Sequence, residues 1–319
     1  MSSTIQSTTP QTIALAAQPI ARPAGRFRTF VRKNPGVVVP SVLLAVIVLA
    51  VLVLPFFLQS PIETHPAQRL LPPGTPGHPL GTDALGRDEL SRLATGGRAS
   101  LGMGVLITVV SGSIGAILGL ISGFFPKAGG IIMRVSDAWM AFPAIVLAMI
   151  FSVVIGPGVL TELLAIGIIF IPFSARVLRS RTMEITSRTF VEAARVSGMG
   201  SWKTLFVHVF PNVAPLLIVQ CIVYIAATML IDGGLSFLGM GISPPAPSWG
   251  NMIAESRSYM QQAPHLLIFP GLILAFTVFL VNQLGTNLRP VFDPQTRALV
   301  ELQRLRSRGN RFDRARRRV

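Results

Sequence analysis

The chain has 319 residues, of which 50% are hydrophobic and only 13% are charged. Soluble domains carry about 25% charged residues, so this composition excludes a disordered chain and disfavours an ordinary soluble protein. The formal net charge of +15 could indicate nucleic-acid binding, but the basic residues form three blocks between long apolar runs. The expected partner is therefore membrane lipid and not nucleic acid. The single cysteine, Cys221, excludes a disulfide framework and a cysteine metal cluster.

The N-terminal segment, residues 1–30, is rich in Ser, Thr, Gln, Ala and Pro and has no periodic apolar face, which predicts a disordered tail. An uncharged apolar run follows at residues 37–58. A helix needs about 20 apolar residues to cross a bilayer, because each residue adds only ~1.5 Å. The run is too long for a signal peptide and no small-residue cleavage site follows it. We therefore expect a retained first transmembrane helix.

Later apolar runs predict further transmembrane helices, at residues 100–124, 132–155, 159–178, 213–240 and 266–286. Together with the first run they predict an all-α membrane protein of six transmembrane helices. The second run is interspersed with glycine and serine, and small residues allow helix backbones to approach closely in lipid. Tight helix packing is the expected role of these glycines.

The distribution of lysine and arginine predicts the orientation, since cytoplasmic loops carry the excess of these residues. With six crossings, 23 of them fall on the side of the two termini and five on the other side. We therefore expect cytoplasmic termini. The chain then divides into a disordered cytoplasmic tail at 1–30, the first helix and an external loop at 31–99, a core of five helices at 100–290 with a cytoplasmic loop at 179–212, and a basic cytoplasmic tail at 291–319 on anionic lipid.

The sequence indicates no catalytic residue, no metal site and no bound cofactor. A nucleotide-hydrolysing protein should carry a glycine-rich loop ending in Gly-Lys-Ser/Thr, and the nearest string, at 198–204, has Trp202 where glycine must precede the lysine. The four histidines fall in loops or at span ends, and no pair of His, Asp or Glu has metal-ligand spacing on a helix. These observations argue against an enzyme.

Charged residues inside or at the ends of predicted spans are candidates for function, because charge is costly there. Arg134 and Asp137 are three residues apart, which predicts an ion pair on one helix face. Glu162 opens the fourth span and suits a first-turn carboxylate. Asp232 lies deep in the fifth span, directly before the glycine pair Gly233-Gly234. It suits a translocation-pathway residue and a helix-end residue equally well.

The loop at 179–212 is predicted to form a helical hairpin. Residues 185–197 read as a helix that breaks at 198–200, and Ser201 can cap a second helix at 202–210. Pro211 should separate this helix from the next span. Two polar helices joined by a glycine turn suit insertion into a partner's groove, and a plain surface hairpin fits the pattern equally well.

Within the hairpin, three features favour docking. The small pair Ala193 and Ala194 permits close approach, Glu192 can accept hydrogen bonds at the rim, and Gly198 allows a turn that a β-carbon would obstruct. With Pro211 thirteen residues after Gly198, the string Glu192-Ala193-Ala194-x3-Gly198 resembles the EAA loop of prokaryotic ABC importer permeases.

Two further groups of residues resemble the permeases of dipeptide and oligopeptide importers, of the DppC/OppC type. They are His78-Pro-Leu-Gly-Thr-Asp83-x2-Gly86-Arg87-Asp88-x2-Ser91-Arg92-x3-Gly96-x-Arg98-x-Ser100-Leu101 before the second span, and Leu235-Ser-Phe-Leu-Gly-Met-Gly241 with Pro244-Pro245-x2-Ser248-Trp249-Gly250 after the fifth. The resemblance covers about residues 27–297. The chain departs from the family pattern at His208, Asp232 and Thr286.

The resemblance implies a type I ABC importer permease fold: a half-channel without catalysis, in a bacterial inner membrane. It implies a homologous second permease subunit (DppB/OppB-like), two ATPases or one fused ATPase (DppD/DppF-like) that use ATP and Mg, and an extracytoplasmic substrate-binding protein. The residues expected to couple to the ATPases are Glu192, Ala193, Ala194, Gly198 and Pro211. Asp232 is a candidate for the translocation pathway. The residues expected to dock the binding protein are Asp83, Arg87, Asp88 and Arg92. The same residues fit equally well a purely structural role, in which Asp–Arg pairs tie a self-contained loop fold.

The resemblance favours dipeptides and oligopeptides as substrates, with nickel chelates, haem, glutathione, sugars or another small solute as alternatives within the same family. A stand-alone secondary transporter or channel is a different class of function. The sequence disfavours it because it shows no internal repeat and no paired midplane charges.

Overall fold

A computed structural model describes residues 35–292. The predicted disordered tail at 1–30 and nearly all of the predicted basic tail at 291–319 lie outside the described residues. Within the described range the regular elements are helices, apart from two isolated β-bridges in the loop after the first helix. The fold is therefore all-α, as predicted.

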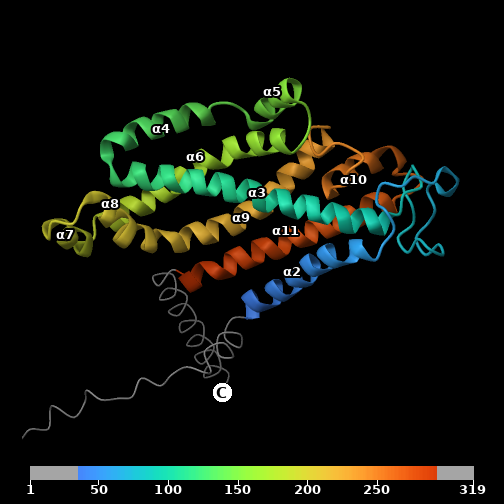
Figure 1. Cartoon of the computed structure of the whole chain (residues 1–319), viewed down its shortest axis with the longest axis horizontal. Helices are drawn as coiled ribbons and strands as arrows, with labels where there is room; N and C mark the ends of the chain where they lie inside the picture. The colour runs from blue at the N-terminus through green and yellow to red at the C-terminus, as the bar shows by residue number, and fades with distance from the viewer. Residues whose placement is uncertain (1–34, 293–319) are drawn as a thin grey trace, which may run out of the picture.

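Five helical segments are long and apolar enough to cross a membrane. They are α2 (Pro35–Val53) with its 3-10 extension η1 (Leu54–Phe56), α3 (Glu89–Phe124), α6 (Val159–Thr186), the segment that ends in α9 (Phe210–Phe237), and α11 (His265–Phe292). Figure 1 shows them running together along the long axis of the molecule. Helix α3 packs against α6 and α9, and α11 packs against α9 and α2.

The predicted third span is broken into two helices. Helix α4 (Pro126–Met140) and helix α5 (Ala144–Ile155) meet at 83°, and both contact α6 (Figure 1). The break falls at Pro143, because proline disfavours the helical conformation of the residue before it. Counted as one bent span, α4 and α5 supply the sixth crossing that the sequence predicted.

Two spanning helices are longer than their apolar runs. Helix α3 begins at Glu89 instead of residue 100, and α6 continues to Thr186 instead of ending near residue 178. Asp88 accounts for the early start of α3, because its side chain accepts a hydrogen bond of 2.8 Å from the backbone N–H of Ser91 and so caps the helix. The helices therefore project into regions that the sequence assigned to loops.

Glycines place α3 directly against α6. A β-carbon at Gly119 would lie 2.8 Å from the Leu178 Cβ, and one at Gly123 would lie 2.6 Å from the Thr182 Cβ. Gly115, one turn earlier, faces Ser174 in the same way. The spacing of four residues on both helices keeps these contacts on one face. The prediction of tight packing is confirmed for this glycine row.

The loop at 179–212, predicted to be cytoplasmic, folds as a hairpin with different helix bounds from those predicted. Its first helix, α7 (Thr189–Val196), is separated from α6 by two residues. The second, α8 (Ser201–Thr204), starts after Gly200, which occupies the cap position, so Ser201 is not the cap. Helix α8 then continues through the π-helical turn η3 (Leu205–Val209) into α9 without a break.

The prediction that Pro211 separates the hairpin from the fifth span is therefore wrong. Pro211 lies in the first turn of α9, where its missing N–H costs little. The preceding π turn holds one more residue than an α turn, which gives the proline ring room beside the earlier carbonyl groups. The second helix of the hairpin and the spanning helix are consequently one continuous segment, from Ser201 to Phe237.

The opposite end of the bundle carries the external loop, with η2 (Pro66–Gln68), together with α10 (Trp249–Ser256) and η4 (Arg257–Tyr259). Figure 1 places α7 and α8 at one extreme of the long axis and α10 with the loop at the other. The two regions expected to meet other proteins are thus separated by the length of the transmembrane helices.

Candidate functional site

The hairpin of α7 and α8 presents most of the residues predicted to couple to a partner. Glu192, Ala193 and Pro211 are exposed, whereas Ala194 is buried. Gly198 ends α7 with φ at +80°, in the left-handed region that glycine adopts without strain. A β-carbon at Gly198 would meet nothing within 4 Å. Glycine is thus required there by the backbone turn and not by a close contact within the chain.

The hairpin is anchored on the bundle by buried apolar side chains, and it also exposes apolar side chains. Val191, Leu205 and Val209 are buried in a hydrophobic cluster with residues of α3 and α6, which fixes the hairpin on the bundle. Four large apolar side chains of α7, α8 and η3 are exposed, and we call them the hairpin patch: Phe190, Val196, Trp202 and Phe206. A surface of this kind at a projecting turn is typical of a protein–protein contact.

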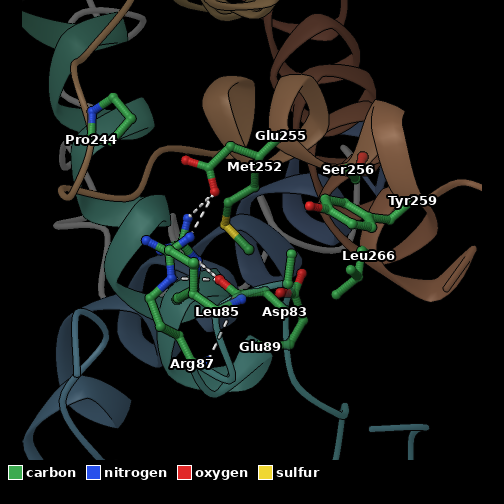
Figure 2. A pocket seen from close by; sticks show the side chains of 12 residues that line it. Asp83, Leu85, Arg87, Glu89, Pro244, Met252, Glu255, Ser256, Tyr259 and Leu266 are labelled. Atoms are coloured by element: carbon green, nitrogen blue, oxygen red, sulfur yellow. Dashed lines mark hydrogen bonds and ion pairs between the residues drawn. The ribbon is translucent and has the colours of Figure 1, made fainter. Parts of the chain in front are cut away.

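At the other end, the external loop is tied by a buried ion-pair network. The Asp83 carboxylate pairs with Arg87 at 2.5 Å and with Arg92 at 3.4 Å, and both arginines reach the Glu255 carboxylate at 2.9 and 2.8 Å. Figure 2 shows Glu255, from α10, above Arg87 and Asp83 of the loop. The network therefore joins two segments that are more than 160 residues apart in the sequence.

Asp88 has a separate structural role. Besides capping α3, its carboxylate lies 2.9 Å from the His78 Nδ1. Asp83, Arg87, Asp88 and Arg92 are each at most 7% exposed. Asp83, Arg87 and Arg92 hold the loop together through Asp–Arg pairs, and Asp88 does so through His78. Their burial leaves little of their charge accessible to a partner. Any docking surface here consists of the loop exterior that they support.

A cavity of about 330 Å³ adjoins this network. Glu89, Met252 and Tyr259 line it, and Figure 2 shows Tyr259 and Leu266 on the side opposite Arg87. One oxygen of the buried Glu89 has no hydrogen-bond partner within residues 35–292. Sequence analysis missed Glu255, because its pairing depends on contact between distant segments.

The two external motif strings of the sequence meet in space. The Trp249 side chain is fully buried and its indole N–H donates to the carbonyl of Leu93 at 2.9 Å, while its backbone N–H donates to the Ser100 hydroxyl at 3.0 Å. Gly97 lies against the indole, where a β-carbon would be 2.8 Å from the ring. The strings are therefore parts of one packing unit.

The predicted ion pair between Arg134 and Asp137 does not form. Asp137 pairs instead with Arg176 of α6 at 2.5 Å. Both partners are more than half exposed, and α4 lies alongside α6, so the arginine of the neighbouring helix competes successfully with the one on the same helix. The pair joins two helices and adds little stability in an exposed setting.

Asp232 adjoins a second acid that sequence analysis treated as a helix-end residue. Glu162, in the first turn of α6, lies with its carboxyl group beside that of Asp232, and both side chains are almost completely buried. The Ser236 hydroxyl donates to Asp232 at 3.2 Å, whereas neither Glu162 oxygen has a partner in hydrogen-bond geometry in the described chain. Asp232 does not line the 330 Å³ cavity beside the external loop. It also does not line a second cavity, which lies between α6, α9 and α11.

The cavity between α6, α9 and α11 is the larger of the two, at about 610 Å³. It lies toward the end of the bundle that carries the hairpin, and it is lined by arginine, amide, tyrosine and apolar side chains. No sequence motif pointed to it, because its lining comes from three helices.

Residues 114–298 match the family of binding-protein-dependent transport system inner membrane components. Among relatives, the chain is 40% identical to the di/tripeptide transport system permease protein DppC of Pseudomonas aeruginosa, over 68% of this chain and 72% of the relative. It is also 40% identical to the glutathione transport system permease protein GsiD of Pectobacterium atrosepticum, over 69% and 74%. It shares 17% identity and a TM-score of 0.48 with a chain of the MetNI methionine ABC transporter in an inward-facing conformation, covering 61% of this chain and 95% of that chain.

The chain therefore belongs to the binding-protein-dependent transport system inner membrane components. It is a multi-pass membrane protein and a transport component, not an enzyme in its own right. The family predicted from the motif strings is confirmed.

Proposed function

We propose that the chain is the permease subunit of an ATP-driven importer for dipeptides and oligopeptides. It forms half of the translocation pathway beside a homologous DppB/OppB-like subunit. Relatives with peptide-transport names support the substrate class, at 40% identity in Pseudomonas aeruginosa and 33% in Alkalihalophilus pseudofirmus. Glutathione, carried by the Pectobacterium relative according to its name, is itself a tripeptide.

The observation that carries this proposal is the hairpin. It projects from the end of the bundle, and its buried apolar residues pack against α3 and α6. Its exposed residues include the hairpin patch, Glu192 and Ala193. Its second helix is continuous with α9, so a force applied to the hairpin acts on a transmembrane helix directly. An ATPase that moves the hairpin would thus tilt α9, a rigid-body step that alternates access.

The remaining partners follow from this arrangement. Two ATPases, or one fused ATPase, would bind the hairpins of the two permease subunits and use ATP and Mg. An extracytoplasmic binding protein would dock on the exterior of the external loop that the Asp83 network supports. The chain would sit in a bacterial inner membrane with cytoplasmic termini, and Asp232 would face the pathway only if α6 and α9 separate at their outer ends.

A substitution at Ala193 tests the coupling role. Ala193→Trp adds a large side chain at an exposed position, so the chain should still fold and insert while docking is blocked. ATP-dependent uptake of a dipeptide should fall at least ~10-fold, with less ATPase recovered on purification of the tagged permease. Ala193→Ser, which keeps the side chain small, is the matched control and should behave as wild type.

Uptake and ATPase recovery that are unchanged by Ala193→Trp, at equal membrane levels of protein, would remove the hairpin from coupling. A wild-type chain that transports dipeptides without any ATPase would overturn the whole proposal in favour of a stand-alone transporter.

A further inference from the structure

The 610 Å³ cavity between α6, α9 and α11 has two chemically different ends. Arg181 of α6, Arg289 of α11 and Asn212 of α9 line the end nearest the hairpin. Gln220 and Tyr224 line the end deeper in the bundle, two to three turns further along α9. With a rise of ~1.5 Å per residue, the lining runs for about 18 Å from Asn212 to Tyr224.

The end of the cavity nearest the hairpin is electropositive. Arg181 pairs with Glu184 at 2.5 Å, but Glu184 is shared with Arg188, which reaches it at 2.7 Å. Arg289 adds a further positive charge across the cavity. Among residues 35–292, three guanidinium groups face one carboxylate here, which leaves an excess of positive charge. Guanidinium groups bind carboxylates with strong, oriented hydrogen bonds.

The end deeper in the bundle carries an unsatisfied hydrogen-bonding group. Gln220 is 8% exposed, and its amide nitrogen donates to the Tyr224 hydroxyl at 2.5 Å. The amide oxygen has no partner within the described chain. Whichever way the amide is turned, one of its polar atoms stays unsatisfied. An unsatisfied buried amide is costly unless a ligand or water completes it.

A lipid acyl chain cannot satisfy Gln220, because it has no polar atom at that depth. A peptide can, since each peptide bond carries both a donor and an acceptor. An extended peptide rises ~3.3 Å per residue, so two to five residues fit along the cavity. Its C-terminal carboxylate would then lie among the arginines, and its side chains would lie against Val177, Leu216 and Val219.

We propose that this cavity is a peptide-binding site in the transport pathway, in which Arg181 and Arg289 hold the C-terminal carboxylate and Gln220 bonds the peptide backbone. The inference rests on the proposed function and specifies where, and by which end, a peptide is held before release.

The probes are the dipeptide alanyl-phenylalanine and its C-terminal amide. Their binding to the assembled nucleotide-free importer is measured without the binding protein, in phosphatidylcholine nanodiscs. The wild type should bind the free acid at least ~10-fold more tightly than the amide. The double variant Arg181→Gln/Arg289→Gln should lose this preference, and Arg181→Lys/Arg289→Lys should retain part of it. Gln220→Leu should weaken binding of both probes alike.

Arg176→Gln is the matched control, because it removes the same charge from the same helix outside the cavity lining. It should leave the preference intact. Equal binding of acid and amide by the wild type, or a preference that survives in the Gln double variant, overturns the inference. So does a result in which the two arginines govern retention of added phosphatidylglycerol and not peptide binding.

ATP-dependent dipeptide uptake and ATPase recovery are measured on the same wild-type preparation. If both are normal while the acid preference is absent, the cavity inference fails and the proposed function stands. If neither is observed, the proposed function itself fails.

Discussion

Two adjoining buried carboxyl groups, those of Glu162 and Asp232, form the most unusual pair in the described part of the chain. Two ionised carboxylates side by side repel each other, and burial removes the water that would stabilise the charge of each carboxylate. A proton shared between the two groups relieves the repulsion, and so does a cation that approaches from a pathway. The two possibilities differ in what an amide at either position would do.

Glu162→Gln should be tolerated, because its amide can donate to Asp232 and replace repulsion with a hydrogen bond. We expect an unchanged or higher unfolding temperature and normal dipeptide uptake. Glu162→Ala should lower the free energy of unfolding by ~1–3 kcal/mol, since it leaves Asp232 buried beside a void. Thermal unfolding of the purified chain measures the stability of both variants, and an uptake assay measures transport by Glu162→Gln.

Asp232→Asn then tests the pathway role. If the charge of Asp232 meets the amino group of a peptide, uptake should fall by roughly 10- to 150-fold, the cost of a charged hydrogen bond. Glu162→Gln is the matched control, with the same chemical change at the neighbouring carboxyl. An equal and small effect of both amides would assign the pair to packing between α6 and α9.

Helices α3 and α6 pack closely because glycines bring their backbones together. The hairpin is anchored on the same two helices. The bent pair α4 and α5 contacts α6, and the exposed ion pair between Asp137 and Arg176 joins α4 to that helix. The close approach of α3 and α6 therefore depends on the glycine row and not on ion pairs.

Gly119→Leu should separate α3 from α6, because even a β-carbon there would lie 2.8 Å from the Leu178 Cβ. We expect a loss of ~1–3 kcal/mol in the free energy of unfolding, and a lower yield of the purified chain. Gly102→Leu, on the same helix in open space, is the matched control and should not destabilise the chain. Equal unfolding temperatures for the two variants would show that the glycine row is not what holds the helices.

The whole bundle has two functional ends, and its proposed orientation assigns one to each side of the membrane. The hairpin lies at one end and the ion-paired external loop at the other (Figure 1). The excess of Lys and Arg on the side of the termini favours a cytoplasmic hairpin.

Cysteines introduced into a Cys221→Ala background test this orientation. Glu63 is exposed in the external loop, and Lys127 is exposed in the first turn of α4. In intact cells an impermeant thiol reagent should label Glu63→Cys and spare Lys127→Cys, and both should react after permeabilisation. Labelling of position 127 alone in intact cells would reverse the topology.

The sequence by itself determined the features that depend on neighbouring residues. Apolar runs revealed the spans, the glycine turn at Gly198 revealed the hairpin, and consecutive motif strings revealed the family. Such patterns are readable because helix formation and membrane insertion act on continuous segments. The Pro143 break and the continuous passage through Pro211 are also local, but proline allows a kink, a boundary or a first-turn position, and packing selects among them.

The tertiary structure alone decided which charged groups meet. Glu255 completes the network of Arg87 and Arg92. Asp137 pairs with Arg176 and not with Arg134. Glu162 adjoins Asp232. The cavity lined by Arg181 and Arg289 likewise needs three helices in place. Each of these contacts joins segments that are distant in the chain. Their formation depends on how whole helices pack, and a one-dimensional pattern carries no information on the distance between two such side chains.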